Sequence, residues 1–318
     1  MYHLAALFPT LRRLRLPLSR DQAVLLLVAL VEIGLAVDIY VAHILDKTIK
    51  PYEWIPIVFG PIAGLLLLLA GVIALRRRTF AALLATTVFI SSAAVGFSGS
   101  WFHLQRAALP AGDLGERLST QLLVWGPPFL GPLMFVLIAL WGISAAWVED
   151  PTDSGRLRLS RRVVLRLPLR KTDVYFLLVA AGVLVATVSA VLDHARTGWG
   201  NSNLWIPTIV GLFAAVVSVA LAAIQWPSRT DLMVYLVAML AMVVTGVLGA
   251  YFHVGDNLTS RGSVVAERFI RGAPVMAPFM YSMVGVFGLV ALLDPAERRR
   301  TREAEALETP QPSQVTTV

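Results

Sequence analysis

The chain has 318 residues, of which 57% are hydrophobic and 15% are charged, with a formal net charge of +7 and no cysteine. Apolar stretches of about 20 residues exclude a soluble globular protein, and the lack of cysteine excludes disulfides, thiolate metal sites, iron–sulfur clusters and c-type haem. The basic residues form short clusters beside the apolar stretches, which favours membrane lipid over nucleic acid as their partner.

Eight apolar segments are long enough to cross a bilayer as helices. The expected spans are 23–46, 54–75, 80–104, 123–147, 173–194, 205–226, 231–253 and 269–293. We expect 1–22 to be a basic cytoplasmic segment that is not a cleaved signal peptide, 152–172 a basic cytoplasmic linker, and 296–318 a disordered tail. The sequence therefore predicts an all-α integral membrane protein.

The distribution of lysine and arginine predicts how the spans are oriented. When the loops are assigned alternately to the two sides, most basic residues fall on the side of the N-terminus. Under the positive-inside rule, both termini are then cytoplasmic, and the loops near 47–53, 105–122, 195–204 and 254–268 face outward. We therefore expect a multi-pass protein of the cell (inner) membrane.

The sequence contains an internal repeat. At an offset of 151 residues the matches are His43 with His194, Gly60 with Gly211, Trp54-Ile55-Pro56 with Trp205-Ile206-Pro207, and Leu14–Leu18 with Leu165–Leu169. At an offset of 150 residues they are Gly96, Gly99 and His103 with Gly246, Gly249 and His253. Each copy holds four expected spans, so the copies run in the same sense. We expect eight transmembrane helices in two tandem, parallel four-helix bundles, 23–151 and 173–295.

Two pairs of prolines also repeat. Pro56 and Pro207 are expected in the first turn of a helix, where the missing N–H leaves no hydrogen bond broken. Pro132 and Pro278 lie within the expected fourth and eighth spans, where they predict kinks.

Four of the five histidines form two pairs that match in the repeat, His43 with His103 and His194 with His253. Each lies near the outward end of an odd-numbered span. In an up-down-up-down bundle the first and third helices face each other diagonally, so the two rings of a pair can bind one object between them.

The residues beneath the histidines are small. Gly99 and Gly96 precede His103 on the same helix face, Gly249 and Gly246 do so beneath His253, and Ala36, Thr187 and Ala190 lie beneath the other two histidines. A porphyrin lies flat against the helix below its ligand, so this pattern favours bis-histidine haem b. Four outward arginines could pair with the propionates: Arg106, Arg117, Arg196 and Arg261.

Other interpretations fit parts of this pattern. Small residues also let membrane helices pack closely, and a histidine at the interface can serve only as a hydrogen-bonding group. Copper could use the same histidines as metal ligands with Met134 in the first copy and Met280 in the second, although both methionines are expected about 10 Å deeper.

Three acidic residues fall within or near the spans. Asp38 and Asp193 lie close to His43 and His194 and could orient an imidazole or serve a proton path. Glu32 is deep in the first span, where an interhelical hydrogen bond is the favoured interpretation.

The overall plan resembles that of the haem A synthase family, whose members have eight spans in two four-helix halves, each with an outward histidine pair. The separations of 60 residues from His43 to His103 and 59 from His194 to His253 fit this plan. In that family the histidines lie on even-numbered helices, with a glutamate three residues before the first, and this sequence has neither feature. The resemblance implies paired haem sites and does not extend to the family's oxygenation chemistry.

The leading interpretation is a membrane b-type cytochrome, or a haem-binding subunit of an electron-transfer complex, with two bis-histidine sites near the outer face. Its partners would be quinone or other respiratory-complex subunits. Two alternatives stay open: a copper-binding or copper-handling membrane protein, and a haem-free transporter or scaffold subunit. The sequence has no phosphate-binding loop, HExxH motif or serine triad, and leaves open whether the protein is an oxidoreductase subunit.

Overall fold

The computed structural model describes residues 2–10, 18–44, 49–108, 124–126, 128–160, 162–259, 265, 268–269 and 272–293, and only the backbone of 2 and 106–108. This part of the chain is mostly helical. Six helices are long and apolar enough to cross a membrane. They are α2 (Arg20–Ile44), α3 (Trp54–Ala74), α4 (Arg78–Ala108), α7 (Lys171–Ala195), α8 (Trp205–Ala223) and α9 (Arg229–Thr259). The prediction of a mostly helical chain is confirmed, and these six helices support a multi-pass membrane protein.

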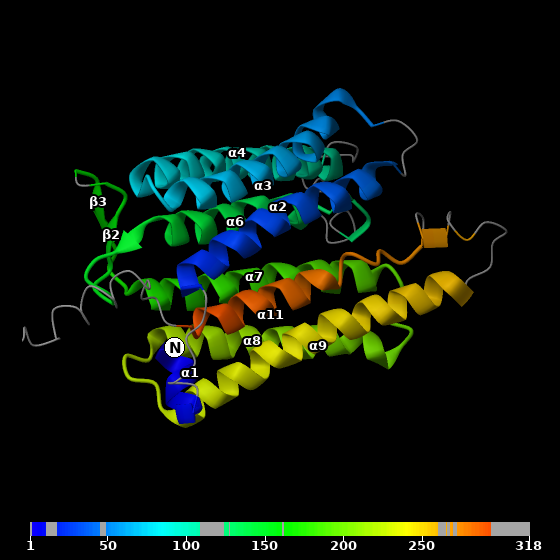
Figure 1. Cartoon of the computed structure of the whole chain (residues 1–318). Coiled ribbons are helices and arrows are strands. Elements are labelled where there is room, and N and C mark those ends of the chain that lie inside the picture. The colour runs from blue at the N-terminus through cyan, green and yellow to red at the C-terminus, as the bar shows by residue number, and fades with distance from the viewer. Residues whose placement is uncertain are drawn as a thin grey trace, which may run out of the picture.

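Two shorter apolar helices, α6 (Leu130–Ala146) and α11 (Phe279–Ala291), lie among the long ones (Figure 1). In the first half of the molecule, which we define as α2, α3, α4 and α6, consecutive helices pack together and α6 closes onto α2. The second half, α7, α8, α9 and α11, has the same order of contacts. The halves meet where α6 contacts α7 and where α11 contacts α2.

Most helix ends lie within four residues of the expected spans, but α9 continues six residues beyond its expected end and two helices differ at the paired prolines. α6 begins at Leu130 and α11 at Phe279, several residues later than expected. Pro132 lies in the first turn of α6 and Pro278 is the N-cap of α11, so neither proline interrupts a helix. The predicted kinks are therefore wrong: the helices start at these prolines.

The matched tryptophans each open a helix. Short 3-10 turns, Pro51–Glu53 and Ser202–Leu204, lead directly into Trp54 of α3 and Trp205 of α8. Pro56 and Pro207 are the third residues of these helices, in the first turn as the sequence predicts.

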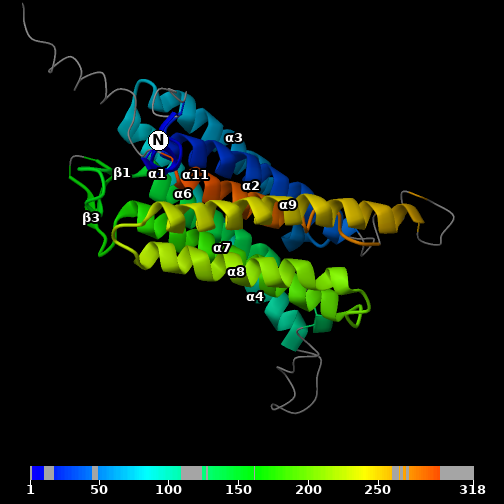
Figure 2. The same ribbon diagram turned by 90° about the horizontal axis from the view of Figure 1, so that it is seen from below.

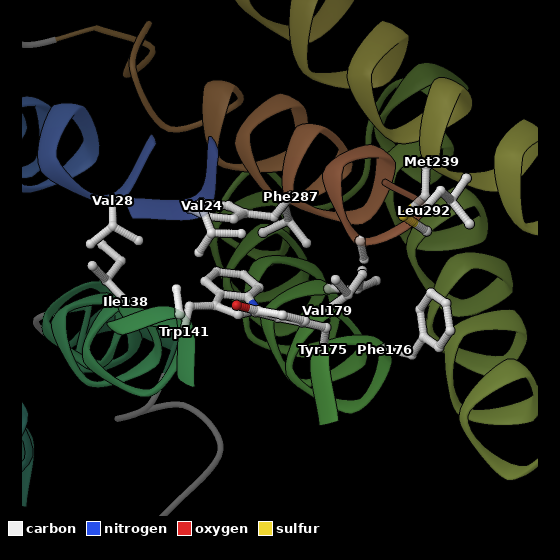
Figure 3. Close-up of a cluster of buried hydrophobic side chains, with 14 of the residues drawn as sticks. Val24, Val28, Ile138, Trp141, Tyr175, Phe176, Val179, Met239, Phe287 and Leu292 are labelled. Atoms are coloured by element: carbon white, nitrogen blue, oxygen red, sulfur yellow. The ribbon is translucent and has the colours of Figure 1, made fainter. Parts of the chain in front are cut away.

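One hydrophobic core joins the two halves. Trp141 of α6 stacks on Phe287 of α11 with ring centroids 4.2 Å apart. Figure 3 shows this pair beside Val24 of α2 and Val179 of α7. Side chains from both halves are buried in the same cluster, so the halves are not independent domains.

The segment between the halves, expected to be a linker, contains a three-stranded antiparallel sheet. The strands are β1 (Val148–Glu149), β2 (Arg156–Arg158) and β3 (Val164–Arg166), in the order β1-β2-β3. The backbone N–H of Lys171 donates to the Glu149 carboxylate at 3.0 Å, which joins the sheet to the start of α7. Two of the three strands, β2 and β3, lie within the expected basic linker 152–172. The described part of the chain is nonetheless mostly helical, as predicted.

The N-terminal segment also has structure of its own. Helix α1 (Tyr2–Leu7) packs against α9, and the backbone N–H groups of His3 and Leu4 donate to the carbonyl of Leu292. His3 is buried, with its ring 5.9 Å from that of Phe176. α2 begins within the expected N-terminal segment, whereas the expected tail 296–318 lies outside the described residues.

A cluster of buried charges lies between the halves at the start of α2 and α7. The Lys171 ammonium lies 2.5 Å from one carboxylate oxygen of Asp21, and Tyr175 donates to the other at 3.2 Å. The Arg20 guanidinium donates to Thr172 and lies over the Tyr175 ring. Arg20 and Lys171 are completely buried and stand 151 residues apart in the sequence, the offset of the repeat. This ion cluster ties the two halves together.

Candidate functional site

The four paired histidines lie near the ends of four different helices. His43 and His194 are each one residue before the end of α2 and α7, and His103 and His253 lie in the last turns of α4 and α9. These helices run in the same direction, so all four rings lie at one end of the bundle, which we call the histidine end. All four residues are half-buried.

The structure brings His43 and His103 together. Their ring centroids are 6.0 Å apart and the ring planes are inclined by 48°. Their helices are not consecutive in the chain, and α3 and α6 each pack against both of them. The two imidazoles, which are 60 residues apart in the sequence, therefore come together through helix packing.

The same nitrogen of each ring is held by a backbone carbonyl. The Nδ1 atoms of His103 and His253 lie 3.0 Å and 2.8 Å from the carbonyl oxygens of Pro128 and Pro274. The Nδ1 of His43 lies 2.8 Å from the carbonyl of Ile39, and that of His194 lies 3.1 Å from the carbonyl of Leu204. A carbonyl can only accept, so Nδ1 is the donor in all four rings.

This arrangement fixes the tautomer of the neutral rings. With the proton on Nδ1, the lone pair is on Nε2, which is the form in which an imidazole binds a metal. Metal-binding histidines typically donate their other N–H to a carbonyl or carboxylate, which also sets the ring orientation. All four histidines therefore have the Nδ1 hydrogen bond to a carbonyl that is typical of metal-binding histidines.

The second pair is arranged differently from the first. The His194 ring makes an edge contact with Trp199 at 5.9 Å, and Trp199 stacks on Trp205 at 4.3 Å. His253 is close enough to His194 for their charges to interact, but among the described residues the two rings are not in contact as in the first pair. Each half thus has one pair of histidines, but the two rings contact each other only in the first half, within the described residues.

The glycines beneath the histidines lie against neighbouring helices. A Cβ on Gly96 would lie 2.8 Å from the Pro132 carbonyl oxygen, and one on Gly99 would lie 2.9 Å from the Pro132 side chain. Gly246 and Gly249 meet Pro278 in the same way. These four glycines allow α4 and α9 to pack closely on the starts of α6 and α11, so the expectation that they support a porphyrin face is corrected.

Ala36 and Thr187 also serve helix packing. They are buried against Gly60 of α3 and Gly211 of α8, two glycines that match in the repeat. Ala190 packs on the edge of the hydrophobic core.

Of the four arginines expected near the propionates, only Arg196 has a described side chain. Its guanidinium donates to the carbonyls of Val124 and Gly126 and lies 3.7 Å from Asp193. Arg117 and Arg261 and the side chain of Arg106 lie outside the described residues.

A small pocket beside Arg196 lies between the halves at the histidine end. It is lined by Pro128, Phe129, Leu130, Ser189, Leu192, Asp193 and Arg196. Pro128 also holds His103, and Asp193 directly precedes His194, so the pocket lies between the two histidine pairs.

The methionines expected for copper lie in the apolar interior. Met134 is completely buried, and Met280 packs against the hydrophobic core. Within the described residues, no three His, Asp or Glu side chains are grouped closely enough to hold a metal ion. A metal at this end would therefore rely on histidine pairs.

Two further acidic residues lie in α2. Glu32 is completely buried and accepts a hydrogen bond from Ser92 of α4, which is the interhelical bond favoured from the sequence. Asp38 is half-buried, five residues before His43. Neither belongs to the histidine pair.

Sequence reasoning missed the carbonyls that orient the rings. Pro128 and Pro274 match in the repeat, but a backbone acceptor is not visible in residue identities until the fold brings the segment to the histidine. A comparison of the chain with protein-family models, curated proteins and solved structures found no match. Any functional assignment must therefore be argued from the geometry of the histidines.

Proposed function

We propose that this protein is a membrane b-type cytochrome, or the haem-carrying subunit of an electron-transfer complex. In this proposal the Nε2 atoms of His43 and His103 bind one haem iron, and those of His194 and His253 bind a second. Its electron partners would be quinone, an extracytoplasmic donor or another membrane subunit.

The observation that carries the proposal is the spacing of His43 and His103 together with their tautomer. Two imidazoles bound to one metal on opposite sides, with metal–nitrogen bonds of about 2 Å, have ring centres about 6 Å apart. The observed separation is 6.0 Å. Both rings direct Nδ1 to a carbonyl, and an imidazole that is protonated on Nδ1 carries its lone pair on Nε2.

The donor set favours haem over a protein-bound metal ion. A low-spin b-type haem would take two ligands from the protein, so each histidine pair would hold one such group. A histidine pair supplies these two ligands, whereas an isolated ion generally takes four or more. Haem b also needs no cysteine, and the chain has none.

The matched contacts support a duplicated architecture of eight spans. The His103 bond to Pro128 and the packing of Gly96 on Pro132 have counterparts in the His253 bond to Pro274 and the packing of Gly246 on Pro278. We include α6 and α11 among the spans because they pack as the fourth helix of each half. Two parallel copies would place both sites at the same depth.

The charge distribution supports an outward position for the histidine end. The opposite end, where α2, α4, α7 and α9 begin, carries Arg76, Arg77, Arg229 and the arginines of the sheet, and we call it the basic end. Under the positive-inside rule this end is cytoplasmic, together with both termini.

The protein's own residues would hold and orient the cofactor. The carbonyls of Ile39, Pro128, Leu204 and Pro274 fix the imidazoles before it binds, which lowers the entropic cost of ligation. Arg196 is positioned between the sites and could pair with a propionate. When bound, the haem supplies reversible one-electron transfer.

The test is a dithionite-reduced minus oxidised visible spectrum of the detergent-purified protein, with pyridine haemochrome and copper quantitation on the same sample. The proposal predicts the sharp bands of low-spin b-type haem. A protein that is folded, lacks haem after expression with added haem precursor, and holds copper in proportion to chain would contradict haem and favour the copper alternative.

A further inference from the structure

The sheet at the basic end presents an unusual arrangement of arginines. In the antiparallel pairing of β2 with β3, Arg156 lies directly opposite Arg166, and Arg158 lies opposite Val164. Side chains directly opposite, and two residues along a strand, share one face. Arg156, Arg158 and Arg166 therefore project from the same face, and all three are exposed.

Within the described part of the chain, only one of these three arginines forms an ion pair. Arg158 pairs with Asp150 at 3.0 Å. Among the described residues, Arg156 and Arg166 make no ion pair with an acidic side chain. Like charges directly across a strand pair repel each other, so this pairing disfavours the sheet unless an anion lies between the guanidinium groups.

The hairpin formed by β2 and β3 also exposes apolar side chains. Val163, Val164, Leu165 and Leu169 are between 37% and 49% exposed. β3 is an edge strand of the sheet. Arginines interleaved with exposed aliphatic side chains are typical of a surface that binds lipid headgroups and contacts the upper part of the acyl chains.

The hairpin is held firmly to the helices. The Glu149 carboxylate accepts hydrogen bonds from the backbone N–H groups of Asp153, Gly155 and Lys171 at 2.8 to 3.0 Å. These bonds join the start of the sheet, its turn and the first residue of α7. Leu157 is buried beneath β2. The arginine face is thus pre-organised rather than assembled on binding.

The position of the hairpin brings it to the headgroup region. β1 begins two residues after α6 ends, and α7 begins five residues after β3 ends. Figures 1 and 2 both show the sheet beyond the ends of the helices, at the same end of the bundle as α1. A sheet in this place, beside the ends of apolar helices, faces phosphate groups when the bundle is in a bilayer.

We propose that the face formed by Arg156, Arg158 and Arg166 binds the phosphate headgroup of an anionic phospholipid, with the exposed Val164, which lies on the same face opposite Arg158, in contact with its glycerol and upper acyl region. A phosphate between Arg156 and Arg166 accepts hydrogen bonds from both guanidinium groups and removes their repulsion. This site is independent of the histidines at the other end.

The experiment is a titration of the full-length protein in neutral detergent with phosphatidylglycerol or phosphatidylcholine, with bound lipid counted by native mass spectrometry. The test variant is Arg156→Gln/Arg166→Gln. The control is Arg76→Gln/Arg77→Gln, which removes the same charge from exposed residues at the same end. We expect the hairpin variant to bind phosphatidylglycerol about 30-fold more weakly, and the control to lose fivefold or less.

A second readout separates the proposal from a loss of folding. In neutral detergent alone, the hairpin variant should melt at the same temperature as the wild type or higher, because the repulsion across the strands is gone. Added phosphatidylglycerol should raise the melting temperature of the wild type and of the control more than that of the hairpin variant.

Three results would overturn the proposal. Equal losses in the hairpin variant and the control would show only a general attraction of the basic end for anions. Equal affinity for phosphatidylcholine, whose phosphate is balanced by a choline cation, would show that the face does not select an anionic lipid. Displacement of the lipid by soluble polyglutamate at equal charge concentration would assign the face to an acidic macromolecule.

Discussion

At the scale of single residues, the histidines show what sequence patterns reveal and what they omit. The repeat places four histidines at one end of the bundle, and the diagonal relation of helices brings His43 to His103 as anticipated. The Nδ1 bonds that select the metal-binding tautomer depend on backbone carbonyls of Pro128 and Pro274, which no residue pattern identifies. Residue identity predicts the ligand type, and the fold supplies its orientation.

Glu32 gives a prediction at this scale. It is completely buried and accepts a hydrogen bond from Ser92. Glu32→Gln keeps an acceptor of the same size, whereas Glu32→Ala leaves the serine hydroxyl buried without it and opens a cavity, at a cost of about 1–3 kcal/mol. Thermal melting in detergent should rank wild type and Gln together, well above Ala. Equal melting of the Gln and Ala variants would mean that the interhelical bond does not stabilise the fold.

His3 gives a prediction about pH. Burial lowers the pKa of His3 to about 4, against an ordinary value of 6.5, although the nearby charge of Asp153 acts in the opposite direction. The neutral ring stabilises the fold above pH 6.5, and this contribution is lost as the pH falls from 6.5 towards 4, because the unfolded chain binds the proton first. His3→Phe should therefore reduce the drop in melting temperature between pH 7 and pH 5. An unchanged drop would show that His3 is not buried in the neutral form.

At the scale of helices, hydropathy located the long spans well because an apolar stretch of sufficient length has few alternatives to a membrane helix. Hydropathy is less successful near Pro128 and Pro274, which lie within the expected fourth and eighth spans but precede the first residues of α6 and α11. The sheet was missed because its strands are only two or three residues long and are rich in arginine. Strands of that length carry no usable periodicity.

The glycines under the histidines were interpreted from the sequence as a porphyrin surface, and the structure assigns them to packing. A Cβ on Gly246 would lie 2.6 Å from the backbone nitrogen of Ser282 and 2.7 Å from the Pro278 carbonyl oxygen. Gly246→Ala should thus force α9 from α11 and cost about 1–3 kcal/mol.

Gly34 is the matched control, since a Cβ there meets nothing within 4 Å in the middle of α2. Gly34→Ala should leave stability unchanged or raise it by up to about 1 kcal/mol through helix propensity. The measurement is the melting temperature of both variants in the same detergent. If both alanines have the same effect, close packing is not the reason for glycine at position 246.

At the scale of the whole molecule, the interface between the halves depends on buried charge. Asp21 neutralises Lys171, which is completely buried. Asp21→Asn should cost about 3–5 kcal/mol, because it leaves the ammonium buried without its counter-ion. Asp150→Asn, which removes a partner of the exposed Arg158, is the control and should cost less than about 1 kcal/mol.

Combining Asp21→Asn with Lys171→Met should restore part of the lost stability, since the uncompensated charge is gone. If the double variant is no more stable than Asp21→Asn, the loss has another cause. The repeat offset links Arg20 to Lys171, but burial of the two cations could not be read from the sequence, where they look like ordinary flanking charges.

The central claim is that each half holds one haem through its own pair of histidines, and its most direct test is the haem content of single-site variants. We predict about two haems per chain in the wild type, about one in either His103→Ala or His253→Ala, and none in the double variant. His3→Ala is the control and should keep both. If haem content is unaffected in the double variant while the protein stays folded, or if no variant and no wild-type preparation contains haem, the histidine pairs are not haem sites.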